Sequence, residues 1–286
     1  MTCYMVFPGV ALNYNDFHME YFDSSFVPAA DLLAIDHCRE GRLEYAAAEN
    51  TVAYMHAGDM KLDRRLHHTG RFIFPTGHYH GLTVGIELAA ARKAFQTELQ
   101  AFAIDVDLIV RKFAPSAYPW VIHDVSMMEH IFGEMYQVPQ TIRLPYFRTK
   151  ILELLLYLQA MEPPRNETAR AYFYRTQVEK VRAVQHFLAE HLAQDIPQEA
   201  LARQFSFPLT SMKKCFQAVT GSSIGAWVTT CRMNRAAEML TCDRTKSIAD
   251  VGCCVGYDSA SKFAAAFRRT MGMTPSEYRM ERGGKE

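Results

Sequence analysis

Hydrophobic and polar positions follow two different periods along the chain, and the change falls near residue 88. Before that point, short apolar runs are separated by turn-forming residues, a pattern typical of β-strands. The runs read LLAIDHC, RLEYAA, VAYMHAG, RFIFPTG and LTVGIEL, and the residues between them include Gly41, Gly58, Asp59, Gly70, Pro75 and Gly77. Many short strands joined by turns predict a sandwich or a small β-barrel.

From about residue 89 the apolar positions recur at helical spacing. The predicted helices are 89–101, 105–113, 124–136 and 146–161, with breaks at Pro115, Pro119, Pro139 and Pro145. Strands followed by helices predict an α+β fold, in which an N-terminal β-barrel carries trailing helices and an all-helical domain comes after it.

The last helix of this half carries an apolar strip similar to the a and d positions of a coiled coil. The strip consists of Leu144, Phe147, Ile151, Leu154, Leu158 and Met161. One interpretation is a homodimer that pairs through Phe147, Ile151, Leu154 and Leu158. The alternative is that the strip packs onto the chain's own β-domain, because the repeat lasts only about two heptads.

A segment rich in proline and polar residues, MEPPRNET, follows this helix and is typical of an interdomain linker. We therefore predict a ligand-sensing and dimerising domain over 1–162 and a linker over 163–176. A second domain, helical throughout, covers 177–286.

The second domain contains two units with the same plan, and such internal repetition is a strong organisational signal. In the first unit, the helices TQVEKVRAVQHFLAEHL and PQEALARQF lead through a tight turn to LTSMKKCFQAVTG, which Gly221 ends. The inward stripe of this last helix is Met212, Cys215, Phe216 and Val219. Its outward face carries polar residues suited to base edges and phosphates: Thr210, Lys213, Lys214 and Gln217.

The second unit repeats the plan about 46–50 residues later. Ser247 is placed to cap the helix IADVGCCVG, and Ser259 is placed to cap ASKFAAAFRRTMG. The turn between them contains Gly256, which can adopt a left-handed conformation. Phe263, Ala266 and Phe267 form the inward stripe, so both units contain a helix, a short turn, a second helix and a glycine stop.

Charge divides between the two halves of the chain, although the net charge is zero. Residues 1–169 contain 14 Lys and Arg against 20 Asp and Glu, a balance of −6. Residues 170–286 contain 17 against 11, a balance of +6. A basic half of this kind indicates contact with a polyanion, since Lys and Arg that neutralise phosphates supply the general affinity for nucleic acid.

Residues 247–279, SIADVGCCVGYDSASKFAAAFRRTMGMTPSEYR, resemble the signature of the AraC/XylS family of transcription regulators. The markers that match are Ile248, Val251, Gly256, Tyr257, Ser261, Phe263, Phe267, Arg268, Gly272, Thr274, Pro275, Tyr278 and Arg279. The first unit matches through Leu201, Ala202, Phe216, Thr220 and Gly221, and the connecting helix through Arg232 and Ala236. The resemblance covers about 110 of the 286 residues.

This resemblance implies that two recognition helices enter successive major grooves of double-stranded DNA, about 34 Å apart. The base-contacting positions it implies are Thr210, Lys213, Lys214 and Gln217 in the first helix and Ala260, Ser261, Ala264 and Ala265 in the second. Lys262, Arg268 and Arg269 are the expected phosphate contacts. The family also implies an N-terminal cupin-like β-barrel that senses a small-molecule effector, a homodimer and contact with RNA polymerase, so an activator is expected.

Two departures from the family pattern affect these expectations. Pro208 replaces the usual capping serine of the first recognition helix, and Thr210 is expected to take over the cap. Ala260, Ala264 and Ala265 replace polar groups of the second helix, and alanine can touch a thymine methyl but cannot form a hydrogen bond. We therefore expect the first unit to discriminate sequence and the second to add affinity and shape readout.

The cysteines and histidines allow minority alternatives. Seven cysteines without a CxxC pair indicate neither a disulfide framework nor a zinc site, which leaves small buried residues or, less readily, redox sensors. His78 and His80, with Glu87 further on and His67 and His68 nearby, resemble a cupin metal site only loosely, because the spacing is too long. We expect no metal, no cofactor and no catalytic residue.

Two alternative functions remain beside the effector-controlled regulator. One is a metal-dependent cupin-type enzyme with a DNA-binding tail, and the other is a regulator whose N-terminal half only dimerises. No run approaches the ~18 apolar residues of a membrane span, and the first residues do not resemble a signal peptide. A cytoplasmic protein without membrane contact is expected.

Overall fold

The computed structural model describes residues 2–28, 30–66, 70–123, 126–163, 172–243 and 245–282. His67 and His68, noted above beside the loose metal pattern, lie outside these ranges. The chain forms two compact units, Met1–Tyr174 and Arg175–Glu286. Within the described ranges, no helix has the length and apolar character needed to cross a membrane.

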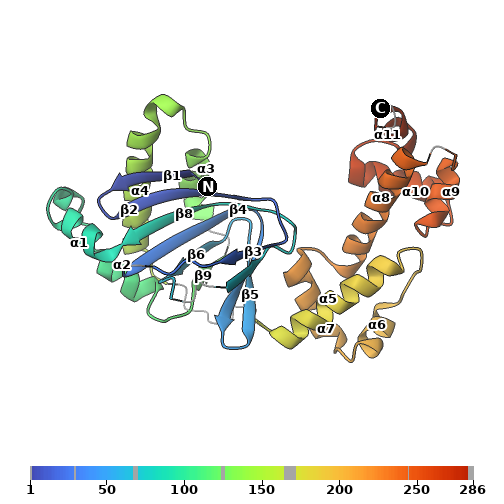
Figure 1. Cartoon of the computed structure of the whole chain (residues 1–286), viewed down its shortest axis with the longest axis horizontal. Helices are drawn as coiled ribbons and strands as arrows, with labels where there is room; N and C mark the ends of the chain where they lie inside the picture. Colours follow the sequence, from blue (N-terminus) through green and yellow to red (C-terminus); the bar gives the residue numbers. More distant parts are fainter. Residues whose placement is uncertain are drawn as a thin grey trace. The chain divides into compact units, whose positions relative to one another are not determined.

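The N-terminal unit is built on an antiparallel sheet whose centre is the long strand β4 (Leu32–Ala48) (Figure 1). The main strand order is β1 (Thr2–Phe7), β2 (Val10–Phe17), β8 (Tyr79–Glu87), β4, β5 (Thr51–His56) and β10 (Phe173–Tyr174). Off this path, β6 (Met60–Asp63) pairs with β4 and β9 (Trp120–Ile122), and β7 (Gly70–Ile73) pairs with β3 (Tyr21–Ser24) and β4. The end of the segment predicted as linker thus forms the edge strand β10.

The sheet is not closed, so the predicted barrel is corrected to a branched, open sheet among the described strands. The reason lies in β4, whose first half pairs with β8 and β6 while its second half pairs with β5 and β7. The register shifts between Cys38 and Glu40. Gly41 follows with φ +86°, where a Cβ would lie 2.2 Å from the carbonyl oxygen of His78, so the strand can change partners only with glycine at this position.

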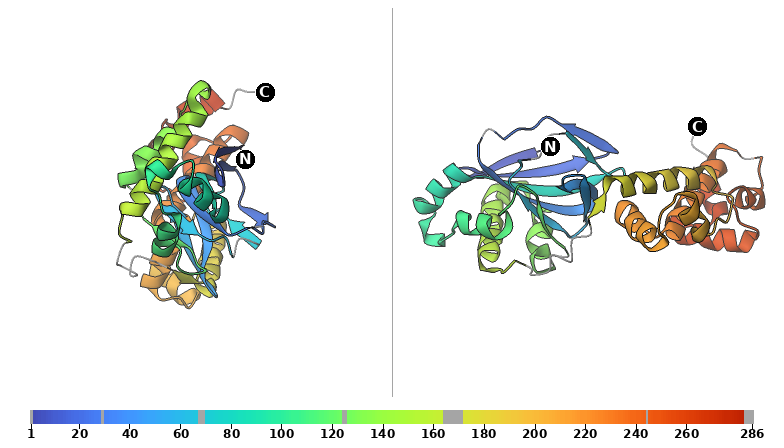
Figure 2. Two further views of the ribbon diagram at one scale, coloured as in Figure 1. Left: turned by 90° about the vertical axis from the view of Figure 1, so that its left-hand side faces the viewer. Right: turned by 90° about the horizontal axis from the view of Figure 1, so that it is seen from below.

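The four predicted helices of this unit are all present, but the first, predicted to residue 101, ends at Gln96. They are α1 (Leu88–Gln96), α2 (Val106–Phe113), α3 (Ser126–Met135) and α4 (Arg143–Ala160), with short 3₁₀ turns at Gln100–Phe102 and Gln140–Ile142. Glu87 caps α1 and Asp105 caps α2 through their carboxylates. The helices gather on one side of the sheet (Figure 2).

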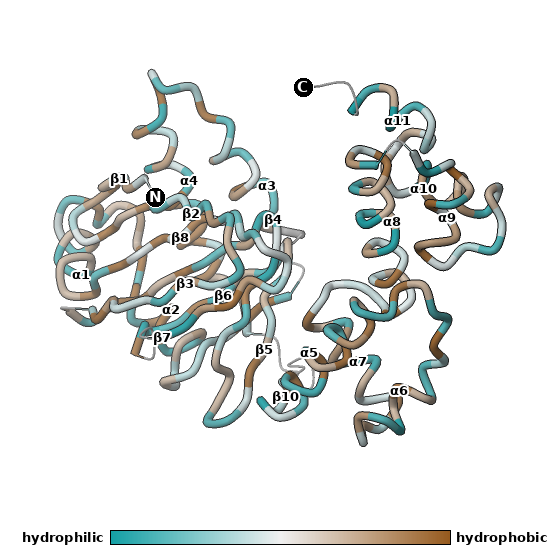
Figure 3. The backbone as a smooth tube through the Cα atoms, turned by 45° about the vertical axis from the view of Figure 1, so that its right-hand side comes forward, coloured by the Kyte–Doolittle hydropathy of each residue, from teal (hydrophilic) through white to brown (hydrophobic). Residues whose placement is uncertain are grey.

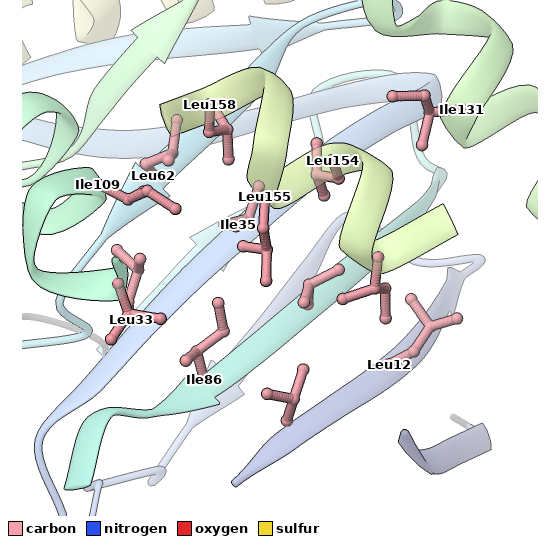
Figure 4. Packing of buried hydrophobic residues seen from close by; sticks show 14 of the residues in the cluster. Leu12, Leu33, Ile35, Leu62, Ile86, Ile109, Ile131, Leu154, Leu155 and Leu158 are labelled. Carbon is pink, nitrogen blue, oxygen red and sulfur yellow. The ribbon is translucent and has the colours of Figure 1, made fainter. Parts of the chain in front are cut away.

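Helix α4 packs its apolar strip against the sheet of its own unit (Figure 4). Phe147, Ile151, Leu154 and Leu158 are each fully buried. Burial of a side chain of this size contributes roughly 1.5–3 kcal/mol, so these four residues stabilise the single chain. They are therefore not available as an exposed dimer seam, and the alternative interpretation of the strip is the one that the structure supports.

A cluster of buried charged residues lies in the sheet, and the hydrophobic pattern of the sequence did not predict it. Lys61 is 2% exposed, and its Nζ lies 2.8 Å from Asp36 Oδ2 and also contacts Asp63. The guanidinium of Arg65 pairs with Asp36 at 2.6 Å and with Asp63 at 3.1 Å. Burial alone would raise the pKa of Asp36, but the charges of Arg65 and Lys61 hold it well below its usual range. The cluster therefore stays ionised and neutral in sum.

The C-terminal unit is helical, as the repeated plan predicted. Its helices are α5 (Arg175–Glu190), α6 (Gln198–Gln204), α7 (Leu209–Thr220), α8 (Ile224–Cys242), α9 (Ile248–Cys254), α10 (Ala260–Met271) and α11 (Pro275–Arg282). Hydrophobic and polar residues alternate along these helices (Figure 3), as expected of helices with one buried stripe. Helix α8 connects the pair α6–α7 to the pair α9–α10.

Candidate nucleic-acid interface

The first helix-turn-helix unit consists of α6, a tight turn and α7. The turn passes through Ser206, a non-glycine residue with φ +46°. The carbonyl oxygen of Ser206 accepts a hydrogen bond of 2.7 Å from Lys180 on α5. Phe207 is buried directly after it. Pro208 occupies the N-cap position of α7 and no side-chain cap hydrogen bond forms there, so the expectation that Thr210 replaces the cap is wrong.

Helix α7 separates its two faces as the sequence predicted. Met212, Cys215, Phe216 and Val219 are buried against the rest of the unit. The predicted base-contacting residues lie on the opposite, exposed face: Thr210, Lys213, Lys214 and Gln217. Gly221 ends the helix in the left-handed conformation, with φ +82°. The structure thus places these four polar side chains together on an exposed helix that follows a turn.

The second unit repeats this geometry with better caps. Ser247 and Asp250 form a reciprocal capping box at the start of α9. Ser259 caps α10 by accepting a hydrogen bond of 3.4 Å from the backbone N–H of Lys262. Phe263 and Phe267 are fully buried, and Gly272 ends α10 with φ +80°.

The outward face of α10 carries small and basic side chains. Ala260, Ser261 and Ala265 are exposed, and Ala264 is half-buried. The three expected phosphate contacts, Lys262, Arg268 and Arg269, are all exposed. Lys262 lies 3.4 Å from Asp258 one turn earlier, and an exposed pair of this kind contributes little to stability. This surface can approach a DNA backbone closely, but only Ser261 among its four predicted base contacts can form a side-chain hydrogen bond.

One feature that sequence reasoning missed is the way the two units are joined. Arg232 on α8 donates hydrogen bonds of 2.7 Å to the carbonyl of Leu192 and 2.9 Å to that of Gln194, in the segment after α5. Its guanidinium also lies 5.8 Å from the ring of Tyr257. A Cβ at Gly256 would lie 2.6 Å from the carbonyl oxygen of Ala193, so the turn of the second unit packs onto the same segment.

These contacts meet at residues 192–194, which we call the junction segment. It touches the connecting helix and the turn between α9 and α10, and it leads from α5 to α6. Arg232 and Gly256 both match the family signature, which was the available signal, but only the structure shows that they pack against successive carbonyls of one segment. The arrangement fixes the two helix-turn-helix units relative to each other.

The loose metal pattern noted in the sequence is not assembled. Glu87 accepts the backbone N–H of Ala90 as the cap of α1, at the opposite end of β8 from His80. His80 instead pairs with Asp16 at 2.9 Å, and the ring of His78 lies 5.8 Å from that of His80. The three residues His78, His80 and Glu87 are therefore not brought to one point.

Comparison with known proteins places the C-terminal unit in a family. Residues 201–281 match the model of a helix-turn-helix domain. The chain is 34% identical over 97 residues to the virulence regulon transcriptional activator VirF of Yersinia enterocolitica, covering 34% of this chain and 35% of that protein. It is 32% identical over 99 residues to the HTH-type transcriptional regulator ExsA of Pseudomonas aeruginosa, covering 35% of each. The C-terminal unit is a helix-turn-helix domain of the AraC type.

The match to curated relatives is partial, since the matched segment spans about a third of the length of each of these two relatives. Among solved structures, the C-terminal domain of AraT from Geobacillus stearothermophilus is 29% identical with a TM-score of 0.36, covering 37% of this chain and 88% of that one. The helix-turn-helix match over residues 201–281 contains α7 and α10, so the two exposed helix faces described above belong to that matched region.

Proposed function

We propose that this chain is a sequence-specific transcription regulator that binds double-stranded DNA with α7 and α10 in successive major grooves. The observation that carries the proposal is the matching geometry of the two pairs. In each pair, the second helix follows a tight turn, buries one stripe of side chains and exposes the opposite face. Ser259 caps the start of α10, whereas α7 starts directly after the turn. Thr210, Lys213, Lys214, Gln217, Ala260, Ser261, Ala264 and Ala265 would contact bases. Lys262, Arg268 and Arg269 would contact phosphates.

The two helices would contribute unequally to recognition. Lysine and glutamine on α7 offer hydrogen bonds to purine edges in the major groove, whereas the alanines of α10 offer only apolar contact. The uncapped start of α7 adds backbone N–H groups and a helix dipole that favour a phosphate. Sequence discrimination would therefore come mainly from α7, while α10 adds affinity and shape readout.

The experiment that tests this function is a pull-down of genomic DNA by the purified protein, read by sequencing at two salt concentrations. We expect a recurring motif with two elements about one helical turn apart. Enrichment of no fragment over bulk DNA at either salt, with and without candidate effectors, would contradict sequence-specific binding. The genes beside the enriched sites would indicate the class of effector.

The N-terminal unit would sense a small-molecule effector, and the chain would activate transcription through contact with RNA polymerase. Activation is supported by relatives named as transcriptional activators, VirF among them. A cavity of about 30 Å³ lies beside Tyr45, Lys61, Arg65 and Phe72. It has room for water only, so an effector would have to open this region or bind elsewhere. A thermal-shift screen tests the idea, because an effector stabilises the unit that binds it.

A homodimer would use the outer face of α4, since the inner face is occupied by the core. Leu156 and Tyr157 are 42% and 38% exposed on that outer face. Replacing Leu156 with glutamate is expected to convert a dimer to a monomer in light scattering, whereas the same change at exposed Met280 in the other unit should leave the mass unchanged. An unchanged dimer in both variants would exclude α4.

A further inference from the structure

A cluster of potential metal ligands lies at the end of the β6–β9 ladder and shares no residue with the pattern that the sequence indicated. Strand β6 pairs with β9 so that Met60 lies opposite Ile122. In an antiparallel pair the next positions, Asp59 and His123, are then also opposite each other. His56 ends β5 at the start of the turn that leads to Asp59. Three segments thus bring two imidazoles and one carboxylate together.

The three side chains converge on a single oxygen. Asp59 Oδ2 lies 3.0 Å from His56 Nδ1 and 3.1 Å from His123 Nδ1. One ligand atom from each residue lies within 4.8 Å of the other two. The carboxylate is 5% exposed, while the two imidazoles are about one-third exposed. An ion can therefore reach the imidazoles from solvent and meet a carboxylate at the base of the site.

The backbone holds this carboxylate in place. Asp59 Oδ2 also accepts the backbone N–H of His56 at 2.7 Å, and the backbone N–H of Asp59 donates to the carbonyl of His56 at 3.0 Å. Hydrogen bonds between Cys38 and both Gly58 and Asp59, at 2.9 and 3.1 Å, tie the turn to β4. Such fixed ligands lose little freedom when they bind an ion, which favours affinity.

The carboxylate of Asp59 has the two imidazoles as its side-chain partners. His56 and His123 each approach Oδ2 through Nδ1, so a cation would replace the protons that these two hydrogen bonds now share. The guanidinium of Arg42 also lies nearby. Burial lowers the pKa of Arg42, while the charge of Asp59 acts to raise it. The guanidinium repels a second cation, so moderate rather than very tight binding is expected.

We propose that His56, Asp59 and His123 form a three-ligand site for a divalent transition metal such as zinc. Two imidazole nitrogens and one carboxylate oxygen are a donor set for zinc or ferrous ion, and three protein ligands leave a coordination position open for water. Each imidazole would bind through Nδ1 and keep its single proton on Nε2. An ion there would link the β5–β6 turn to the end of β9.

A second cluster with the same types of side chain, Asp16, His18 and His80, provides a control for the metal-binding test. There Asp16 is 63% exposed and His18 72% exposed, so the ligands are free to move and bind an ion poorly. A histidine at either cluster can be replaced by glutamine, whose amide N–H can still donate to the carboxylate. Such a variant preserves a purely structural hydrogen bond but removes a metal ligand.

The test is calorimetric titration of the full-length, tag-free, chelator-treated protein with zinc, using the parent, His123→Gln, His56→Gln and His80→Gln. We expect one equivalent to bind the parent and the His80→Gln variant equally. His123→Gln and His56→Gln should each weaken zinc binding at least about 100-fold, because loss of an outer-shell partner alone costs about 10–100-fold. Cobalt should give intense visible absorption, typical of four-coordinate sites, with the parent and the His80→Gln variant but not with His123→Gln or His56→Gln.

Three results would overturn the proposal. They are no zinc binding by the parent, unchanged binding by His123→Gln, and loss of binding by His80→Gln alone. Urea unfolding of each metal-free variant separates ligand loss from misfolding, and equal unfolding midpoints are expected. The site lies in the N-terminal unit, so DNA binding by the metal-free protein, measured alongside, remains an independent test of the proposed function.

Discussion

His37 shows how a single buried residue can make stability depend on pH. It is 6% exposed, stacks on Phe132 at a ring distance of 4.1 Å, and its Nδ1 has no hydrogen-bond partner among the described residues. Burial lowers the pKa of His37 to about 4. The hydrophobic pattern predicted strand β4 but not this histidine's contact, because the contact depends on α3 returning to the sheet more than 90 residues later.

The folded chain therefore resists protonation of His37, while the unfolded chain accepts a proton below its ordinary pKa of about 6.5. The stability due to the neutral ring is complete above that pH and is lost as the pH falls toward 4. We expect this residue to reduce the free energy of unfolding by about 2 kcal/mol between pH 7 and pH 5. Urea denaturation at both pH values, compared with His37→Leu, measures the difference. Equal pH dependence in the two proteins would refute the assignment.

At the scale of single elements, helices were predicted better than the contacts between them. Apolar spacing and the glycine stops located α7 and α10 and their exposed faces, because helix period and capping are local properties. The strip on α4 was recognised as apolar, but its partner was not, since spacing alone does not distinguish the chain's own sheet from a second copy. The prediction of a barrel is wrong for a similar reason. The change of partners along β4 depends on pairing with strands that lie far away in the sequence.

The division of labour between α7 and α10 yields a prediction about these elements. Replacing Lys213 and Lys214 by alanine should remove about 1–3 kcal/mol of discrimination between the selected site and a site with one altered element. Ser261→Ala should leave that discrimination nearly intact. Competitive binding assays with the DNA recovered by the pull-down measure both. Discrimination that survives the double change and disappears with Ser261→Ala would reverse the assignment.

Loss of the contacts at the junction segment should change the tolerated distance between the two DNA elements rather than the preferred bases. Arg232→Met keeps the aliphatic stem but loses two charge-assisted hydrogen bonds to Leu192 and Gln194, each worth about 1.5–3 kcal/mol. With the two units less firmly joined, the variant should bind the selected site more weakly and discriminate less against a site lengthened by one base pair.

The matched control is Arg235→Met on the same helix, where Arg235 makes an exposed pair of 3.0 Å with Glu238. Such a pair contributes at most about 1 kcal/mol, so both affinity and spacing preference should stay close to those of the parent. If Arg232→Met kept the parent's spacing preference while losing stability, the arginine would support folding without positioning the helices.

At the scale of the whole molecule, opposite charge on the two halves makes salt the most informative variable. The net charge of zero gives no indication of DNA binding, whereas the +6 balance of residues 170–286 does. Each phosphate contact adds about 0.9 to the magnitude of the negative slope of log affinity against log salt. Exposed Lys262, Arg268 and Arg269 should therefore each account for roughly one unit of that slope.

Alanine at each of these three positions, assayed by fluorescence anisotropy over a salt series, should reduce the slope by about one and weaken binding to all sequences alike. Arg71, which pairs with Asp23 at 2.9 Å in the acidic N-terminal unit, is the control and should leave the slope unchanged. A slope that falls equally in the Arg71 variant would mean that the N-terminal unit also contacts the phosphates. An unchanged slope in all variants would place the phosphate contacts on another face of the C-terminal unit.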